Sequence, residues 1–248
     1  DIDDETAFRG TQQFLDNIRY TRRLLWYRKH HHRDGNRLKV ITLAREPISW
    51  YWGHVAENFD LYGQLILDWF EGSSGRSSLG EADPALVREA TIAFHESLFD
   101  AMSRMQTPLD DPGFQREAGR LIPELGPFLP RQLMKLRLPT AWFDTTFEPN
   151  IDIDVYRASL DPRTGTARLD NDFAEVLVIR YEDLDSAIEP LRTFLDRPKL
   201  DLGRQNATRE KRLRVDIKEI ASQVTPPKGM HDRLRDTRYC RHFGYPAR

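Results

Sequence analysis

The chain has 248 residues, a formal net charge of −2 at pH 7, and 39% hydrophobic and 10% aromatic residues, which is enough apolar material for one large folded domain. No run of about 20 apolar residues occurs, so the sequence predicts no transmembrane segment. The single cysteine, Cys240, excludes an internal disulfide, and we therefore expect a fold independent of oxidation and a cytoplasmic location. The sequence begins at Asp1 without an initiator methionine, which we interpret as a sign that further residues precede it.

The near-neutral net charge hides a strong segregation of charge along the chain. Residues 18–45 contain nine Arg or Lys against one acidic residue, whereas residues 57–111 contain eleven acidic residues against three Arg. Residues 204–218 and 228–248 each contain six basic and two acidic residues. Basic ends around an acidic middle favour one positive face that attracts phosphate, sulfate or an anionic polymer. The alternative is a set of ordinary solvated arginine side chains.

The first half of the chain is predicted to contain one strand among several helices. Apolar residues at helical spacing predict a helix over residues 5–28, and a β-branched run predicts a strand at 38–43. Pro47 then occupies a position that is allowed in the first turn of a helix. Further helices are expected at residues 59–70, 84–105 and in parts of 114–138. We interpret residues 59–138 as a helical insertion between elements of a sheet.

The second half of the chain alternates strands with helices. Strands are expected at residues 153–156, at 166–169 as the return of a hairpin after a turn at 161–165, and at 176–181. The last of these is a continuous apolar run, typical of a strand buried on both faces. Helices are expected at residues 186–195, 208–223 and 229–237. This alternation predicts a single α/β domain over residues 1–248, with a mainly parallel sheet flanked by helices.

The segment from Val40 to Ser49 carries the clearest chemical signal. It predicts a buried strand that ends in Arg45, followed by Pro47 and a helix that carries Ser49. A helix N-terminus offers unpaired amides and a favourable dipole to an anion, and an arginine at the strand tip adds a charged fork. Ligands of open α/β sheets bind outside the carboxyl ends of the strands, where Arg45 falls. The segment therefore predicts an anion site; the alternative is a strand–helix corner whose arginine binds a neighbouring carboxylate.

The segment Leu43-Ala44-Arg45-Glu46-Pro47-Ile48-Ser49 resembles the 3′-phosphate-binding segment of sulfotransferases that use 3′-phosphoadenosine 5′-phosphosulfate (PAPS). Other stretches resemble, in the same order, those of the bacterial "putative capsular polysaccharide synthesis" proteins of that fold: Thr140–Asp144, Ile153–Tyr156, Asp161–Gly165, Val176–Leu184, Asn206 with Lys211, and Tyr239–Phe243. The resemblance covers about residues 39–243 and is weakest between 61 and 138. It implies the P-loop-like sulfotransferase fold and sulfuryl transfer from PAPS to a hydroxyl of a carbohydrate or similar acceptor, without a metal.

The chain departs from the family pattern at two places. The family's 5′-phosphosulfate loop, with Lys, Gly and Ser or Thr at a helix start, does not occur before Leu38. We expect it upstream of Asp1; the alternative is that the chain lacks the first strand and this half of the site. The family also places a serine eight residues after the arginine, where this chain has Gly53. If Arg45, Ser49 and Gly53 share one helical stripe, the Ser49 hydroxyl substitutes one turn earlier.

The resemblance implies roles for individual residues. Arg45, Ser49 and Gly53 would form part of the nucleotide site, and Lys211, with Arg209, would lie near the 3′-phosphate. His54 is the first candidate for the general base that takes the acceptor's proton, ahead of His95, Glu57 and Asp144. In the 181–184 segment, the two acidic residues are expected to cap the next helix.

A second function stays open on the sequence alone. It is a non-catalytic, sulfotransferase-like domain that binds an anionic polymer or a partner protein in a larger assembly. No nucleic-acid-binding module is recognisable, so nucleic acid is not an expected partner. The sequence makes no prediction of the oligomeric state.

Overall fold

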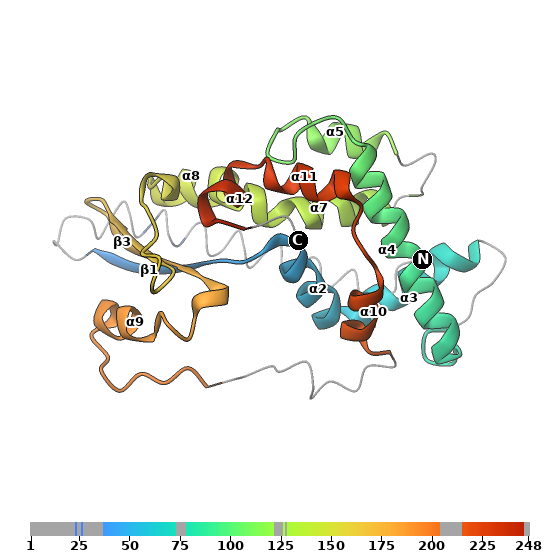
Figure 1. Ribbon diagram of the computed structural model, residues 1–248, viewed down its shortest axis with the longest axis horizontal. Helices are drawn as coiled ribbons and strands as arrows, with labels where there is room; N and C mark the ends of the chain where they lie inside the picture. Colours follow the sequence, from blue (N-terminus) through green and yellow to red (C-terminus); the bar gives the residue numbers. More distant parts are fainter. Residues whose placement is uncertain are drawn as a thin grey trace. The chain divides into compact units, whose positions relative to one another are not determined.

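The computed structural model describes residues 23, 26, 37–72, 78–121, 126, 128–203 and 215–245 (Figure 1). The chain divides into two units. Unit 1 comprises Asp1–Ala44 and Trp142–Asp201, and unit 2 comprises Arg45–Ala141 and Leu202–Arg248. Most of the helix expected over residues 5–28 lies outside the described residues, although Arg23 and Trp26 within it are helical.

Unit 1 is built on a three-stranded mixed sheet with the strand order β1-β3-β2. β1 (Leu38–Ala44) is parallel to β3 (Ala174–Arg180), whereas β2 (Thr166–Asp170) is antiparallel to β3. The three strands confirm the predictions for residues 38–43, 166–169 and 176–181, but the sheet is mixed rather than mainly parallel. A tight turn explains the difference, because the side-chain oxygen of Asn171 accepts hydrogen bonds from the backbone N–H groups of Phe173 and Ala174. This turn joins β2 directly to β3 as a hairpin.

The prediction of a strand at residues 153–156 is wrong. Val155–Arg157 form a 3₁₀ helix (η4), because the side chain of Asp154 accepts a hydrogen bond of 3.0 Å from the N–H of Tyr156. Such a local side-chain cap competes with strand pairing even where the residues are apolar and β-branched. The predicted turn at 161–165 is present, and the N–H of Gly165 donates to the carbonyl of Asp161 at 2.8 Å.

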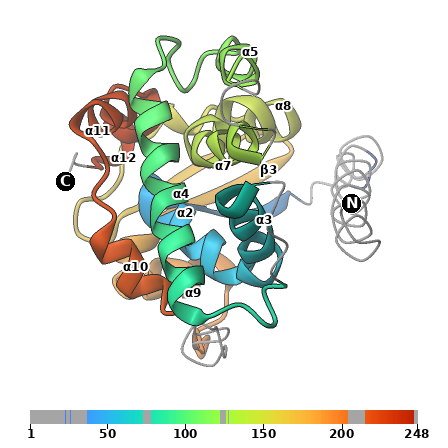
Figure 2. The ribbon, with the colours of Figure 1, turned by 90° about the vertical axis from the view of Figure 1, so that its right-hand side faces the viewer.

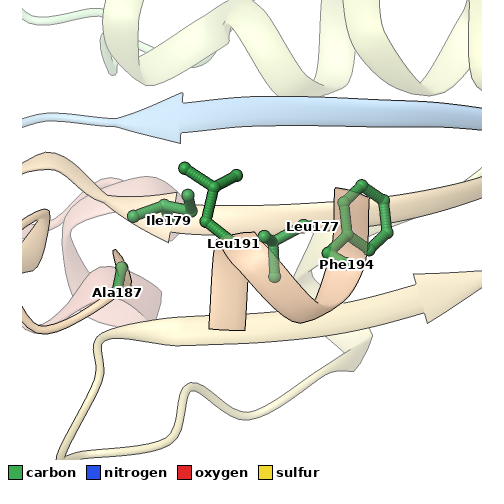
Figure 3. Close-up of a cluster of buried hydrophobic side chains, with 5 residues drawn as sticks. All are labelled: Leu177, Ile179, Ala187, Leu191 and Phe194. Carbon is green, nitrogen blue, oxygen red and sulfur yellow. The ribbon is translucent and has the colours of Figure 1, made fainter. Parts of the chain in front are cut away.

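The core of unit 1 lies between β3 and the helix α9 (Ile188–Leu195). Five buried side chains form this cluster, in which those of β3 meet those of α9 (Figure 3): Leu177, Ile179, Ala187, Leu191 and Phe194. β3 is buried on both faces as predicted, but β1 is not. The side chains of Ile41 and Leu43 on β1 are 41% and 49% exposed. β1 lies at the edge of the described sheet, and the strand residues of this cluster all come from β3.

The acidic residues of the 181–184 segment do not cap α9. The N-cap of that helix is Ala187, which makes no side-chain cap hydrogen bond. The carboxylate of Asp183, in the 3₁₀ helix η5 (Tyr181–Asp183), is bonded to the guanidinium of Arg180 instead. Asp183 also lies against Gly165, where a Cβ atom would be 2.1 Å from the carboxylate oxygen Oδ2. Gly165 has φ of 61°, so both its backbone conformation and its surroundings require glycine.

The described residues of unit 1 also include a short π-helix and one further helix, α8 (Glu148–Ile151). The π-helix η3 (Phe143–Phe147) leads directly into α8. Arg37, just before β1, forms ion pairs with Asp170 of β2 and Glu175 of β3. These pairs connect all three strands of the sheet at one end.

Unit 2 is helical in its described residues. Its helices are α2 (Pro47–Glu57), α3 (Phe59–Glu71), α4 (Pro84–Arg104), α5 (Phe114–Gly119), α7 (Phe128–Trp142, whose last residue falls in unit 1), α10 (Ile217–Gln223), α11 (Lys228–Arg235) and α12 (Arg238–Phe243). α4 packs against α3, α10 and α11 (Figure 2). The structure thus confirms the helices expected between residues 47 and 138.

The C-terminal helices differ in extent from the prediction. Of the helix expected over 208–223, the part 208–214 lies outside the described residues, and α10 begins at Ile217, where Asp216 caps it. The helix expected at 229–237 ends as α11 at Arg235. Thr237 then caps a separate helix, α12, by accepting from the N–H of Cys240 at 3.2 Å. No described helix is both long enough and apolar enough to cross a membrane.

Candidate functional site

Arg45 is the first residue after β1, and Tyr239 of α12 holds its backbone. The N–H of Arg45 donates to the Tyr239 hydroxyl at 2.8 Å, and the same hydroxyl donates to the carbonyl of Arg45 at 2.8 Å. Tyr239 is 2% exposed, whereas Arg45 is half-buried. The peptide groups on both sides of the Arg45 Cα atom are therefore anchored to a buried side chain.

The guanidinium of Arg45 lies over Gly53. A Cβ atom at Gly53 would be 3.0 Å from Nη1 of Arg45 and 3.5 Å from its Cζ atom. Because α2 begins at Pro47, Arg45 lies outside that helix, and its extended side chain reaches along α2 to Gly53. The structure thus brings together two of the five residues predicted for the nucleotide site, Arg45 and Gly53. A Cβ atom at Gly53 would require the flexible end of Arg45 to move by only a few tenths of an ångström.

The first amides of α2 are capped by a carboxylate of the same chain. Glu46, the N-cap residue, accepts hydrogen bonds from the N–H groups of Ile48 and Ser49, at 3.1 and 2.6 Å. An acidic group at this position also interacts favourably with the helix dipole. An external anion would therefore have to displace Glu46 to reach these two amides. Ser49 is exposed in the first turn of α2, so the helix carries it as predicted. The helical stripe expected to join it to Arg45 and Gly53 does not form, because Arg45 precedes the helix.

His54 lies in the last turn of α2, where it contacts Trp50 of the same helix, the C-cap residue Asn58 and Tyr62 of α3. Its Nε2 atom is 2.8 Å from the hydroxyl of Tyr62, and its Nδ1 atom is 3.3 Å from the amide nitrogen of Asn58. An amide nitrogen only donates, so Nδ1 accepts and Nε2 carries the proton that is donated to Tyr62. The Trp50 ring stacks on the imidazole at 5.1 Å with an angle of 7° between the planes.

The surroundings of His54 keep its imidazole neutral. Burial, together with the positive charge of Lys135, lowers the pKa of His54 from 6.5 to about 4. At pH 7 the ring is therefore able to accept a proton, and Nδ1 is the atom with the free-base lone pair. That lone pair is bonded to Asn58, so proton transfer requires this 3.3 Å contact to open.

The other candidates for a general base differ sharply in exposure. His95 on α4 is completely buried, its Nδ1–H donates to the carbonyl of Thr91 at 2.6 Å, and burial lowers its pKa to about 4. A substrate from solution does not reach His95 in this conformation. Glu57 is exposed in the last turn of α2. Asp144 belongs to unit 1, where its carboxylate faces the hydroxyl of Tyr156 at 3.5 Å.

A group of buried polar atoms in unit 2 was not anticipated from the sequence. Tyr51 Oη, His95 Nε2 and Gln132 Oε1 are buried and make no hydrogen bond within the described part of the chain. The rings of Tyr51 and His95 are 5.7 Å apart and nearly perpendicular. Burial raises the pKa of Tyr51 well above 10. From the sequence, the aromatic run 50–52 could form either core packing or a surface for a sugar or adenine. Neither interpretation predicts these orphaned atoms, because they leave no trace in hydrophobic periodicity.

Neither the remaining predicted residues nor the comparisons with known proteins identify a further residue of the site. Arg209 and Lys211 lie outside the described residues. Among the residues with described positions, no group of three His, Cys, Asp or Glu side chains is placed to hold a metal ion. Comparison of the chain with family models, with curated proteins and with solved structures finds no match.

Proposed function

We propose that this chain is a sulfotransferase domain that binds PAPS through Arg45 and transfers its sulfuryl group to a hydroxyl acceptor of carbohydrate type. The observation that supports this proposal is the position of the Arg45 guanidinium, directly after a parallel strand, over Gly53 and next to a helix start. A guanidinium presents a rigid fork of donors that matches two oxygens of a phosphate. The resemblance of residues 43–49 assigns the 3′-phosphate of the nucleotide to this position.

The reaction is an in-line displacement at sulfur. The acceptor oxygen forms a bond to sulfur while the bond from sulfur to the 5′-phosphate oxygen breaks, and adenosine 3′,5′-bisphosphate leaves with the electron pair. Positive groups that neutralise the nucleotide's charge hold it in place, and a base takes the acceptor's proton. In this proposal Arg45, together with Lys211 and Arg209, binds the 3′-phosphate. His54 takes the proton at Nδ1 once the contact to Asn58 opens.

Calorimetric titration with adenosine 3′,5′-bisphosphate tests the nucleotide site. Arg45→Ala is expected to weaken binding at least tenfold, because the phosphate loses its charged partner. Arg104→Ala is the matched control, since Arg104 is an exposed arginine of unit 2 that pairs with Asp100 at 3.0 Å. The control should bind the nucleotide like the unaltered chain. Absence of binding to the unaltered chain at millimolar nucleotide overturns the proposal.

The role of His54 is tested by turnover rather than by affinity. His54→Ala should lower the rate at which adenosine 3′,5′-bisphosphate is released from PAPS in the presence of a hydroxyl acceptor, and it should change nucleotide affinity less than twofold. A base acts only in the transition state, whereas nucleotide binding precedes it. An unchanged rate removes His54 from the mechanism.

The capping carboxylate of Glu46 favours a second candidate function. Because it already occupies two amides of the α2 N-terminus, the domain is also consistent with a non-catalytic role in which the basic segments bind an anionic polymer. Glu46→Gln separates the two functions, since it removes the negative charge and keeps a side-chain oxygen for the cap. In a sulfotransferase the substitution strengthens nucleotide binding. In a polymer-binding domain neither form binds the nucleotide, and both bind heparin as a probe.

A further inference from the structure

We propose that Tyr239 is a positioning residue for nucleotide binding, because its hydroxyl fixes the backbone of Arg45. The inference rests on the proposed function, and it assigns a role that the sequence did not reveal. The hydroxyl bonds to both the N–H and the carbonyl of Arg45, each at 2.8 Å, across 194 residues of sequence. Both of these bonds are made to the backbone of Arg45, so through them the hydroxyl fixes the atoms from which the guanidinium side chain extends.

The ring and the hydroxyl of Tyr239 have separate roles. The ring packs with Phe243 and Tyr245, at centroid distances of 4.9 and 5.7 Å, and phenylalanine would retain these contacts. A phenol supplies one donor and accepts through its lone pairs, and here the donor and an acceptor are both directed to one residue. Loss of the hydroxyl therefore removes two bonds to Arg45 while it leaves the packing of α12 in place.

The backbone anchor matters because of where Arg45 lies. It follows the last residue of β1 and precedes Glu46, the N-cap of α2, so its Cα atom is the origin from which the side chain reaches Gly53. An arginine side chain has several rotatable bonds, and a shift of its origin displaces the charged end. A pre-positioned guanidinium loses less conformational entropy when it binds a phosphate. Tyr239 thus makes affinity at Arg45 depend on the correct docking of α12.

A double-mutant cycle tests this inference. Calorimetric titration with adenosine 3′,5′-bisphosphate would compare the unaltered chain with Tyr239→Phe, Arg45→Ala and the double variant. Tyr239→Phe is expected to weaken nucleotide binding five- to tenfold, and to have no further effect in the Arg45→Ala background, because it acts through Arg45. Tyr51→Phe is the matched control, since it removes a buried tyrosine hydroxyl of unit 2 that has no hydrogen-bond partner in the described residues. Its nucleotide affinity should remain within twofold.

Hydrogen exchange supplies a readout that does not depend on a ligand. The amide of Arg45 donates to Tyr239, so Tyr239→Phe should speed its exchange at least tenfold, with little change at amides inside α4. Unchanged exchange overturns the backbone anchor. If the nucleotide binds the unaltered chain and Tyr239→Phe alike, or if Tyr239→Phe weakens binding equally in both backgrounds, the positioning role is wrong. If no form binds the nucleotide, the proposed function itself fails, even where the exchange result shows the anchor.

Discussion

The two units of the chain differ in how they accommodate polar groups. In unit 1, charged side chains beside the sheet have partners close by, as Arg37 has in Asp170 and Arg180 has in Asp183. In unit 2, several buried side-chain atoms have no hydrogen-bond partner within the described residues, among them Tyr51 Oη, His95 Nε2 and Gln132 Oε1 in the helical core. An unsatisfied buried polar group costs about 1–3 kcal/mol, so stability alone does not explain the choice of residues in unit 2. The same unit holds Arg45 and Gly53, the two residues on which the proposed nucleotide site depends.

The largest expected effect is in unit 1, at the contact between Gly165 and Asp183. Gly165→Ala should lower the free energy of unfolding by about 3 kcal/mol, because the new Cβ atom meets a carboxylate that is bonded to Arg180 and because φ is positive. Chemical denaturation measures the change. Gly119→Ala is the control, since no heavy atom lies within 4 Å of its added Cβ atom, and it should change stability by less than about 0.5 kcal/mol. Equal losses in the two variants would contradict the tight fit at Gly165.

The next effect is a pH dependence that arises in unit 2. The pKa of His95 is about 4 in the folded chain and 6.5 ordinarily. Between pH 4 and 6.5 the unfolded chain therefore binds a proton at His95 that the folded chain does not bind. The stability from neutral His95 is complete above about pH 6.5 and is lost as the pH falls toward 4, by about 3 kcal/mol. His54 has the same shift and adds to the slope.

Unfolding free energies measured between pH 7 and 4.5 test this expectation. The stability of a His95→Leu variant should fall less steeply with decreasing pH than that of the unaltered chain, because one of the two shifted groups is gone. Parallel curves for the two proteins would show that His95 takes up its proton in the folded state.

A smaller effect on the free energy of unfolding is expected from removing a buried hydroxyl in unit 2, and its sign depends on whether that hydroxyl is hydrogen-bonded. Tyr51→Phe should raise the free energy of unfolding by about 1 kcal/mol, because it removes a buried polar atom that has no partner in the described residues. Thr91→Val should lower it by a similar amount, since the buried Thr91 hydroxyl donates to the carbonyl of Val87 at 2.6 Å. Thermal unfolding of both variants gives the comparison. A loss of stability in Tyr51→Phe would mean that its hydroxyl is bonded after all.

The smallest effect on stability is expected for a substitution of Gly53, which lies under the Arg45 guanidinium. Gly53→Ala should stabilise the chain by about 0.5 kcal/mol, because alanine favours the interior of α2 and the flexible end of Arg45 has only a few tenths of an ångström to yield. Gly63→Ala on α3 is the contrast, since its Cβ atom would lie 2.8 Å from Leu79 in a buried position, and it should destabilise. The unfolding midpoints in denaturant would show the opposite signs, and matching signs would contradict this account of Gly53.

The elements that the sequence predicted correctly are those with local signals. A β-branched run marked β1, a continuous apolar run marked β3, and Pro47 marked the start of α2, since these preferences act within a few residues. The prediction failed at residues 153–156, where one side-chain bond from Asp154 outweighs strand propensity. It failed again at the 181–184 segment, where Arg180 binds the carboxylate that was expected to cap α9.

The sequence by itself determined that an arginine follows a strand and precedes a helix, because strand propensity and proline geometry are properties of neighbouring residues. Only the tertiary structure decided what surrounds that arginine. Tyr239 reaches its backbone across 194 residues, and Gly53 receives its guanidinium two turns into α2. Such contacts depend on how helices pack against one another, and no periodicity along the chain encodes which distant side chain will arrive there.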